Sequence, residues 1–375
     1  MLAFDVAVVG LGAMGSAALA ALARRGLRAI GIEQFTPGHD RGSSHGRTRL
    51  IRLGYFEHPS YVPLLREAYP LWREIEARSG QSLLHVTGIV EIGPPRGRLV
   101  EGTLRSAREH GLTHEVLDAG ALMRRFPAFR LPADVVGVFQ PDGGFLMAEA
   151  AIEAQIVLAR ADGAQMRTGE RVTAIEAHGT GVRITTEHGR IEAGAAIVTA
   201  GPWLKQLLPD LPVPLRVTRQ VLGWFAPKEP ALFAEGRFPV FLLESPHGLH
   251  YGFPLDGAAG VKIAKHHHLG EEVDAASPPR TVTPADEEAI RSAVAAYLPQ
   301  ANGPLISATT CLYTMTPDED FVLDHLPGHP QIVVGSPCSG HGFKFSPVIG
   351  AILADLATAG TTRRDIARFR LARFA

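Results

Sequence analysis

The hydrophobic pattern of the first 35 residues predicts a strand, a helix and a second strand. Residues 4–9 (FDVAVV) are almost continuously apolar and rich in valine, which is typical of a buried strand. Residues 14–26 (MGSAALAALARRG) are small and apolar and end in glycine, a pattern that favours a packed helix. Residues 28–35 (RAIGIEQF) predict the next strand. The chain therefore begins with a nucleotide-binding type of α/β unit.

The rest of the chain is richer in strand signals than in helical ones. Helical periodicity is visible at 61–80, 99–111 and 147–161, and again from Pro284, with Thr283 as the expected N-cap. Strand signals occur at 82–93, 135–146, 164–204, 215–270, 304–314 and 331–336. A hairpin turn is expected at His188–Gly189. Strands that end in nucleotide-type turns occur at the start, near residue 200 and near the end, which predicts one domain assembled from separated stretches.

Three glycines follow the first strand with the spacing of a dinucleotide-binding motif. Gly10, Gly12 and Gly15 form G-x-G-x-x-G at the start of the predicted helix, and Glu33 ends the second strand. Glycines let the backbone approach a pyrophosphate, the helix N-terminus favours its charge, and the carboxylate accepts hydrogen bonds from ribose hydroxyls. Glu33 also disfavours a 2′-phosphate. FAD or NAD is therefore expected in preference to NADP, and the motif alone does not separate the two.

Composition limits the class of protein. The chain has 375 residues, 46% of them hydrophobic, which predicts a soluble protein of two domains. A net charge of −1 gives no electrostatic reason to expect nucleic acid or a membrane as partner. Two cysteines cannot form a disulfide framework, and the first strand leaves no room for a signal peptide, so the cytoplasm is the expected location. The run KHHH at 265–268 suggests no metal site, because consecutive histidines of a strand alternate faces.

Several longer motifs resemble one family of flavoenzymes. They are VVGLGAMGSAA (8–18), GSSHGRTRLIR (42–52), HYGFP (250–254), GVKIAKH (260–266), CLYTMTPDEDFVLD (311–324) and GHGFKFSPVIG (340–350). Together they resemble the monomeric sarcosine oxidase and N-methyltryptophan oxidase family, within the wider group of D-amino-acid-oxidase-like flavoenzymes. The resemblance runs in order from residue 5 to about residue 360.

The resemblance implies FAD-dependent oxidation of a secondary amine in an amino acid. The products implied are an imine, which water converts to an aldehyde and an amine, and H2O2 from O2. Sarcosine is the substrate expected first, while larger N-methyl amino acids and cyclic imino acids such as proline or pipecolate stay open. The partners implied are thus a small amino acid and O2, and the family name implies a monomer.

The resemblance also implies a fold and a division of the chain. The fold class expected is α/β, with a Rossmann-like FAD-binding domain built from discontinuous segments and a strand-rich α+β substrate domain. The FAD-binding domain is expected to comprise 1–82, 146–214 and 308–375, and the substrate domain 83–145 and 215–307.

Cys311 matches the cysteine to which this family attaches FAD covalently through the 8α-methyl group. The second cysteine, Cys338, is expected only to pack near the cofactor. The residues expected to bind the cofactor are Gly10, Gly12, Ala13, Met14, Gly15, Glu33, Ser43, Ser44, Arg49, Val172, Ala200, Gly201, Trp203, Cys311, Gly340, Gly342 and Lys344.

Lys262 matches the lysine with which the family activates oxygen. In GVKIAKH, strand alternation places Lys262 and His266 on one face, and Lys265 and His267 on the other. The resemblance makes His266 an active-site histidine, whereas Lys265 and His267 are expected to be solvated.

Arg52 and Lys344 match the pair that holds the substrate carboxylate, a task that suits the planar fork of arginine. Arg49 matches a flavin-facing residue, and Tyr251 and Tyr313 match tyrosines of the substrate pocket. For two further positions the resemblance gives no definite role. Tyr55 is a further possible pocket residue, and His250 stands where an aromatic residue is expected, which leaves the preferred substrate side chain open.

Three other functions remain open from the sequence. A flavin dehydrogenase would pass electrons to a carrier in place of O2, which would leave Lys262 without its expected task. A flavin-binding protein without turnover would not require Arg52, Lys262 and Lys344. An NAD-linked enzyme would not explain the C-terminal motifs.

Overall fold

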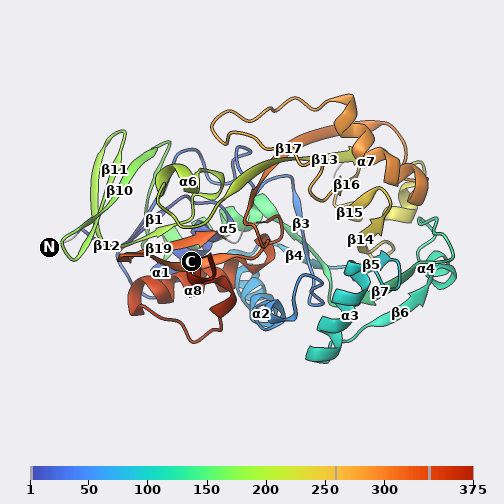
Figure 1. Cartoon of the computed structure of the whole chain (residues 1–375), viewed down its shortest axis with the longest axis horizontal. Coiled ribbons are helices and arrows are strands. Elements are labelled where there is room, and N and C mark those ends of the chain that lie inside the picture. The colour runs from blue at the N-terminus through green and yellow to red at the C-terminus, as the bar shows by residue number, and fades with distance from the viewer. Residues whose placement is uncertain (1–2, 258–259, 337–338, 375) are drawn as a thin grey trace.

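The computed structural model describes residues 3–257, 260–336 and 339–374. Two eight-stranded sheets occupy the two ends of an elongated molecule, and a three-stranded sheet lies between them (Figure 1). Among the described residues, no helix has both the length and the apolar character that a bilayer-spanning segment needs.

The first sheet is assembled from distant parts of the chain. Its strands are β1 (Phe4–Val9), β2 (Ala29–Glu33), β9 (Gln165–Thr168), β10 (Val172–His178), β11 (Gly181–Thr186), β12 (Gly189–Val198), β18 (Val322–Leu326) and β19 (His329–Ser336). The order is β10-β11-β12-β1-β2-β9, with β19 paired to β12 and β18 to β19. β1 runs parallel to both of its neighbours, β2 and β12. The predicted discontinuous assembly is therefore confirmed for this sheet.

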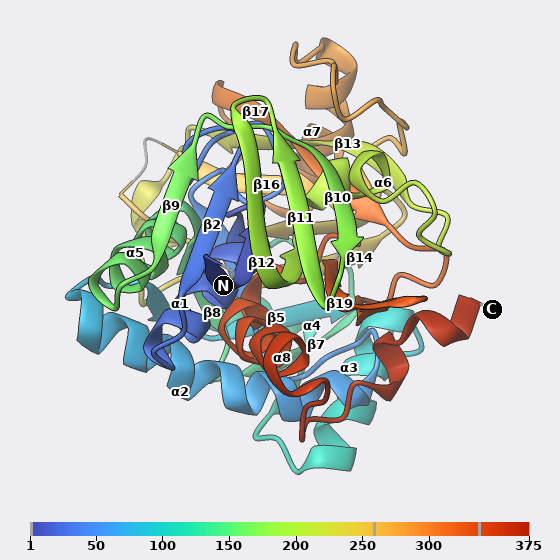
Figure 2. The same cartoon turned by 90° about the vertical axis from the view of Figure 1, so that its left-hand side faces the viewer.

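Helices cover one face of the first sheet. They are α1 (Ala13–Arg24), α2 (Val62–Ser79), α5 (Ala148–Ala161) and α8 (Ser346–Ala359). α1 packs against both α5 and α8, and Figure 2 shows these helices below the strands. Alternate residues of β1 point to opposite faces of the sheet. Val6 and Val8 pack in the core with the helices, whereas Ala7 and Val9 pack in the core on the other face. The short α6 (Leu204–Leu207) also lies on that other side, against β10.

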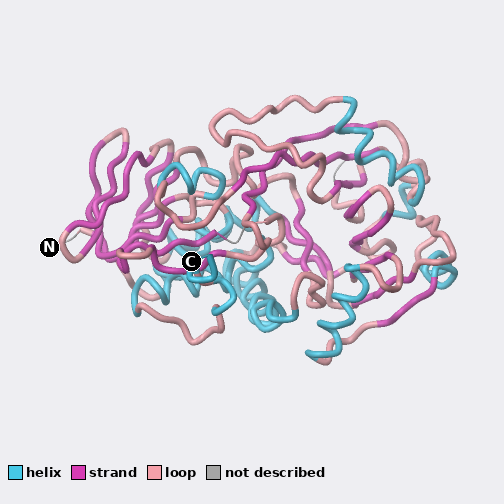
Figure 3. The backbone as a smooth tube through the Cα atoms, in the orientation of Figure 1, coloured by secondary structure: helices cyan, strands magenta, loops and turns pink. Residues whose placement is uncertain are grey.

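The second sheet is mainly antiparallel. Its order is β17 (Leu305–Met315), β13 (Arg216–Phe225), β16 (Val261–Lys265), β15 (Gly248–Gly252), β14 (Val240–Ser245), β5 (Ile89–Gly93), β7 (Val136–Gln140) and β6 (Glu115–Asp118). One face forms an apolar core with α4 (Ala119–Arg125) and α7 (Pro284–Tyr297), and α3 (Arg98–His110) contacts β5 and β7. Figure 3 shows the long loop that joins β16 to α7 along the top of the molecule. The third sheet has the order β3 (Thr48–Ile51), β8 (Gly144–Met147), β4 (Leu84–Val86).

The expected α/β fold class is confirmed, and the local signals explain several boundaries. Thr283 accepts a hydrogen bond from the Asp286 backbone N–H, and α7 begins at Pro284 as predicted. β11 and β12 are joined at residues 187–188, where the hairpin was expected. The division into domains stays a prediction. One of its boundaries, residue 308, falls inside β17, which pairs along its length with β13 of the second sheet.

Candidate active site

A cavity of about 380 Å³ extends from the glycine motif to the second sheet. Its wall includes Gly10 and Glu33 from the first sheet, Cys311 from β17, and Arg52 and Lys344 from the connecting segments. Residues that are far apart in the sequence thus meet around one space.

The end of the cavity near α1 fits a dinucleotide. α1 begins after Gly12, which has no side chain to cap it, and its first turn has no acidic residue. The Ala13 N–H donates to Ser44 Oγ at 3.4 Å, and the N-terminus as a whole can bind a pyrophosphate. A Cβ at Gly15 would lie 1.7 Å from the Gly10 carbonyl oxygen, so only glycine allows this close turn. The Glu33 carboxylate accepts hydrogen bonds from the backbone N–H groups of Leu11 (2.7 Å) and Phe35 (3.0 Å) and lines the cavity.

One row of side chains crosses five strands of the second sheet beneath the other end of the cavity. The neighbours in register are Glu91, Leu242, Tyr251, Ala264 and Leu222. Directly paired residues point to the same face of a sheet. Leu222, Leu242 and Tyr251 line the cavity, which identifies this face as its floor.

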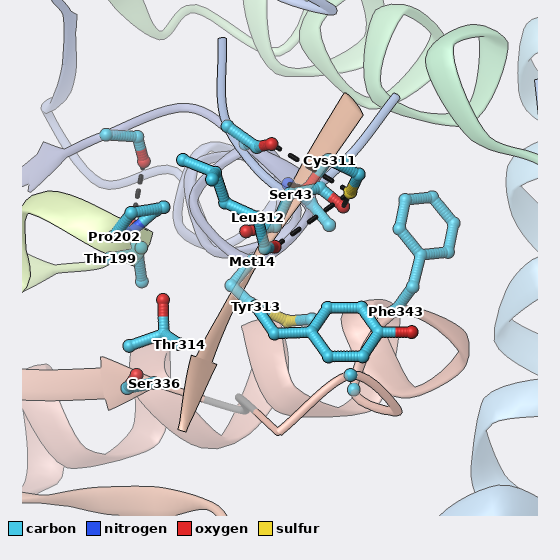
Figure 4. Close-up of a pocket in the computed structure, with 18 of the residues that line it drawn as sticks. Met14, Ser43, Thr199, Pro202, Cys311, Leu312, Tyr313, Thr314, Ser336 and Phe343 are labelled. Atoms are coloured by element: carbon cyan, nitrogen blue, oxygen red, sulfur yellow. Dashed lines mark hydrogen bonds between the residues drawn. The ribbon is translucent and has the colours of Figure 1, made fainter. Parts of the chain in front are cut away.

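Cys311 lies at the edge of this floor. Its side chain is buried in contact with Leu222, Trp224 and Ala264, and its sulfur lines the cavity. The sulfur lies 3.6 Å from the Ser43 carbonyl oxygen (Figure 4). It also lies 3.7 Å from Nη2 of Arg49. The thiol is therefore next to a cation and open to the space where a flavin ring would bind.

Arg52 and Lys344 are two buried cations that face the same part of the cavity. Nη2 of Arg52 donates to both carboxylate oxygens of Glu57, at 2.8 and 2.7 Å, and Nη1 donates to the Gly54 carbonyl at 2.6 Å. Nζ of Lys344 donates to the His341 carbonyl at 2.8 Å. Burial, and then the charge of Arg52, lower the pKa of Lys344 to about 7.

A model of the family described as "FAD dependent oxidoreductase" matches residues 5–356 of the chain. The chain belongs to this family. The match settles the choice between FAD and NAD, which the glycine motif alone left open. The protein is therefore an FAD-dependent oxidoreductase.

Characterised relatives span almost the whole of this FAD-dependent oxidoreductase. The chain is 40% identical over 371 residues to a monomeric sarcosine oxidase of Streptomyces avermitilis, covering 98% of this chain and 96% of the relative. It is 39% identical to an N-methyl-L-tryptophan oxidase of Salmonella arizonae, with 99% of both chains covered. The solved structure of NikD, described as an unusual amino acid oxidase essential for nikkomycin biosynthesis, superimposes with a TM-score of 0.86 at 28% identity, covering 99% of this chain and 98% of NikD. Glycine oxidase from Geobacillus kaustophilus, at 21% identity and a TM-score of 0.81 over 99% and 98% of the two chains, shares the fold.

The cavity of this flavoenzyme brings together most of the residues expected from the sequence. Those that line it are Gly10, Gly12, Ala13, Met14, Glu33, Ser43, Ser44, Arg49, Arg52, Val172, Ala200, Gly201, Trp203, Tyr251, His266, Cys311, Tyr313, Gly340, Gly342 and Lys344. Gly15 and Lys262 lie behind the wall, and Cys338 is outside the described residues. The individual roles remain predictions.

Lys262 is fully buried behind the wall. Its Nζ donates to the backbone carbonyls of Gly46 and Thr48, each at 2.7 Å, and lies 4.7 Å from the ring centre of Phe253. Burial lowers the pKa of Lys262 well below its usual value, and the nearby charge of Arg49 adds to this effect. The predicted alternation of β16 is confirmed, because Val261 and Ile263 pack in the core on the opposite face.

His266 and the two tyrosines form a polar group at the cavity. Nδ1 of His266 lies 3.4 Å from the Tyr313 hydroxyl, which forms a hydrogen bond with Tyr251. Burial lowers the pKa of His266 well below its usual value, so the imidazole is neutral. The His267 side chain is 39% exposed, as expected for a solvated residue. Its ring centre nevertheless lies 4.0 Å from that of His266, because β16 ends at Lys265 and the backbone turns to a φ of 61° at His267.

His250 and Tyr55 do not line the cavity. The His250 ring points away from it, and its Nε2 lies 3.1 Å from the Ala289 carbonyl of α7. His250 therefore does not shape the substrate pocket. Tyr55 supports the site from behind, since its hydroxyl lies 2.7 Å from Nδ1 of His341, which does line the cavity.

Sequence reasoning missed two carboxylates next to Arg52. Glu57 follows Arg52 by five residues in an irregular segment that gave no signal. Glu91 interrupts the apolar strand GIVEIG and is fully buried. An acidic residue within such a strand needs a cationic or donor partner, and this was the signal that could have revealed it. Among the described residues, no group of three His, Cys, Asp or Glu side chains could hold a metal ion.

Proposed function

We propose that this enzyme oxidises the secondary amine of an N-alkyl amino acid, with sarcosine as the first candidate substrate. The supporting observation is that Arg52 and Lys344 face the same cavity as Cys311 and Tyr251. The relatives named for sarcosine and N-methyl-L-tryptophan support the same substrate class. FAD, when bound, takes a hydride equivalent from the carbon next to nitrogen, and O2 finally receives the two electrons as H2O2. Water then converts the imine to an aldehyde and an amine.

The carboxylate of the substrate would bind to Arg52 in place of Glu57. Nη2 of Arg52 is occupied by both oxygens of Glu57, whose side chain remains 12% exposed in a segment without regular structure. A substrate carboxylate offers the same charge and geometry, so the exchange conserves the buried ion pair. Lys344 lies beside it, and a bound carboxylate would favour the protonated form of this lysine, whose pKa is about 7 without substrate.

His266 is placed to hydrogen-bond the substrate amine. An amine must lose its ammonium proton before a hydride can leave the neighbouring carbon. The His266 ring lines the cavity, and its Nδ1 lies 3.4 Å from the Tyr313 hydroxyl. Burial lowers the pKa of His266, which favours an imidazole that binds the unprotonated amine.

Cys311 is proposed to hold FAD through a thioether to the 8α-methyl group. Bond formation replaces one methyl hydrogen and the thiol hydrogen, and the two electrons and two protons released pass to O2. The position of the sulfur at the cavity, 3.7 Å from the Arg49 guanidinium, supports this proposal. A monomeric state and a cytoplasmic location are proposed as well, on the basis of the sequence.

Substrate-dependent spectra would test the function. The purified holoenzyme is mixed without oxygen with sarcosine, N-methyl-L-tryptophan or L-proline, and bleaching of the flavin absorbance is recorded. H2O2 formation is measured with oxygen present. Bleaching by an N-methyl amino acid together with H2O2 is expected. Bleaching without oxygen consumption would favour a dehydrogenase, and no bleaching by any of the three would contradict the proposal.

Arg52→Ala is expected to weaken the binding of carboxylates by about a hundredfold, because a buried charge-assisted pair is lost. The change is measured as the Kd of methoxyacetate, which carries no amine, from the shift of the flavin spectrum in the holoenzyme. Arg47→Ala is the matched control, because Arg47 is partly exposed and pairs with Asp256. An unchanged Kd in Arg52→Ala would contradict the role of Arg52.

A further inference from the structure

A closed ring of polar contacts holds Arg52 from the side opposite to Glu57. Nη1 of Arg52 lies 3.5 Å from Oε1 of Glu91, and Oε2 of Glu91 accepts from Nε2 of Gln140 at 3.3 Å. Oε1 of Gln140 accepts from the Gly54 backbone N–H at 2.8 Å, and the Gly54 carbonyl accepts from Nη1 of Arg52. Glu91 and Gln140 belong to β5 and β7, whereas Arg52 and Gly54 belong to the segment after β3. The ring therefore ties this segment to the second sheet.

Two buried polar atoms of the ring lack a well-formed hydrogen bond to the described residues, although the Thr103 hydroxyl lies close enough to Glu91 to lower its pKa. They are Oε1 of Glu91 and Nε of Arg52. Buried polar groups of a native protein are nearly always hydrogen-bonded, so two orphaned groups of opposite character at one site call for an explanation. A small shift of the guanidinium would satisfy Oε1 of Glu91, which already lies beside Nη1.

The contacts divide the guanidinium into two parts. Nη1 is bound on the protein side by Gly54 and Glu91. Nη2 is bound only to Glu57, and Nε is free of hydrogen bonds to the described residues. The edge formed by Nε and Nη2 can bind a carboxylate with both of its oxygens once Glu57 leaves. Nη1 meanwhile can stay in place.

We propose that Glu91 is a positioning residue that holds Nη1 of Arg52 while the opposite edge of the guanidinium exchanges Glu57 for the substrate carboxylate. This inference rests on the proposed function of Arg52. Without Glu91, the guanidinium would keep the Gly54 carbonyl and its contacts with the Tyr55 and Phe56 rings, at 4.3 and 4.8 Å from their centres. It would lose the anionic partner that fixes the direction of the edge that receives the substrate. Tighter hydrogen bonding between Glu91 and Nη1 in the substrate complex also satisfies the orphaned oxygen.

The proposal predicts that loss of the Glu91 charge weakens substrate binding and changes the rate of flavin reduction little. Glu91→Gln keeps the shape of the side chain and removes its charge. The Kd of methoxyacetate and the KM of the substrate are expected to rise about tenfold, because a buried donor loses its ionic partner, while the limiting rate of flavin reduction changes less than about threefold. Glu244→Gln is the matched control in the neighbouring strand β14, where the carboxylate binds the backbone N–H of Leu99 away from the cavity.

The pH dependence of methoxyacetate affinity distinguishes a positioning role of Glu91 from simple repulsion between its charge and the bound carboxylate. Burial raises the pKa of Glu91 to about 7, so it is neutralised as pH falls through that value. The charged groups facing it are Arg52, Glu57 and Lys344, while its neighbours Gln140 and Leu242 do not titrate. Since the pKa of Lys344 is also about 7, the profile is measured in Lys344→Met.

In Lys344→Met, methoxyacetate affinity is expected to fall by about tenfold from about pH 8.5 to about pH 5.5, and this dependence should vanish in Lys344→Met/Glu91→Gln. A rise in affinity as pH falls would overturn the proposal, because Glu91 would then act only by repelling the carboxylate. Equal Kd values in Glu91→Gln and the parent holoenzyme would also overturn it. Methoxyacetate binding does not require turnover. If no N-methyl amino acid bleaches the flavin, the proposed function fails while the role of Glu91 is still decided by these Kd values.

Discussion

Lys262→Met is expected to slow the reaction of the reduced enzyme with O2 by about a hundredfold or more. The first electron transfer to oxygen creates a negative charge. The protonated form of Lys262, which three oxygen acceptors favour against its burial, would stabilise that charge from behind the cavity wall. Lys262 is held in position by the carbonyls of Gly46 and Thr48, so little reorganisation accompanies this step. Methionine has a similar length and no charge.

The measurement is stopped-flow mixing of the substrate-reduced enzyme with oxygenated buffer, followed by the return of flavin absorbance. Anaerobic reduction by substrate is timed in the same preparations and is expected to change less than about threefold. Lys265→Met provides the control, because Lys265 lies on the same strand but is paired with His250, whose side chain faces away from the cavity. Equal losses in both half-reactions would show that Lys262 has a structural role and does not act on oxygen.

Cys311→Ser is expected to abolish the covalent attachment of FAD while leaving FAD binding intact. Serine keeps the size of the side chain, and its hydroxyl is far less nucleophilic than a thiolate. The protein is precipitated with acid, and flavin absorbance is measured in the washed pellet and in the supernatant. The parent protein should retain its flavin in the pellet, and the variant should release all of it.

Cys338→Ser is the control for this experiment, since it removes the other cysteine of the chain. Its pellet should stay yellow. Flavin in the supernatant of the parent protein would assign Cys311 to packing against Leu222 and Trp224. The enzyme would then keep its cofactor by non-covalent contacts alone.

The sequence was sufficient for features that depend on local patterns. The helix and strands around Gly10, the start of α7 at Pro284 and the alternation along β16 all follow from neighbouring residues. The resemblance of the motifs placed Arg52 and Lys344 at one site before any contact was known. These features require no knowledge of which strands pair.

Features that depend on long-range register were not predictable in this way. Glu91 reaches Arg52 because β5 pairs with β14 so that Glu91 lies next to Leu242, 151 positions later in the chain. The tilted contact between the His266 and His267 rings depends on a left-handed backbone after the end of β16, which the alternation of a regular strand does not predict. His250 was connected with the pocket because the resemblance expects an aromatic residue at this position, whereas its partner on α7 shows that it faces away.

The two faces of the second sheet have different tasks: one face lines the cavity, and the other belongs to the apolar core. Leu222, Leu242 and Tyr251 face the cavity, whereas the adjacent Val221 and Leu243 pack in the core with α4 and α7. Exchanging the first set alters the cavity surface and leaves the core packing in place. Directed-evolution libraries for new amine substrates should therefore diversify Leu222 and Leu242 and keep Val221 and Leu243 fixed. A stable scaffold would then tolerate many versions of the same pocket.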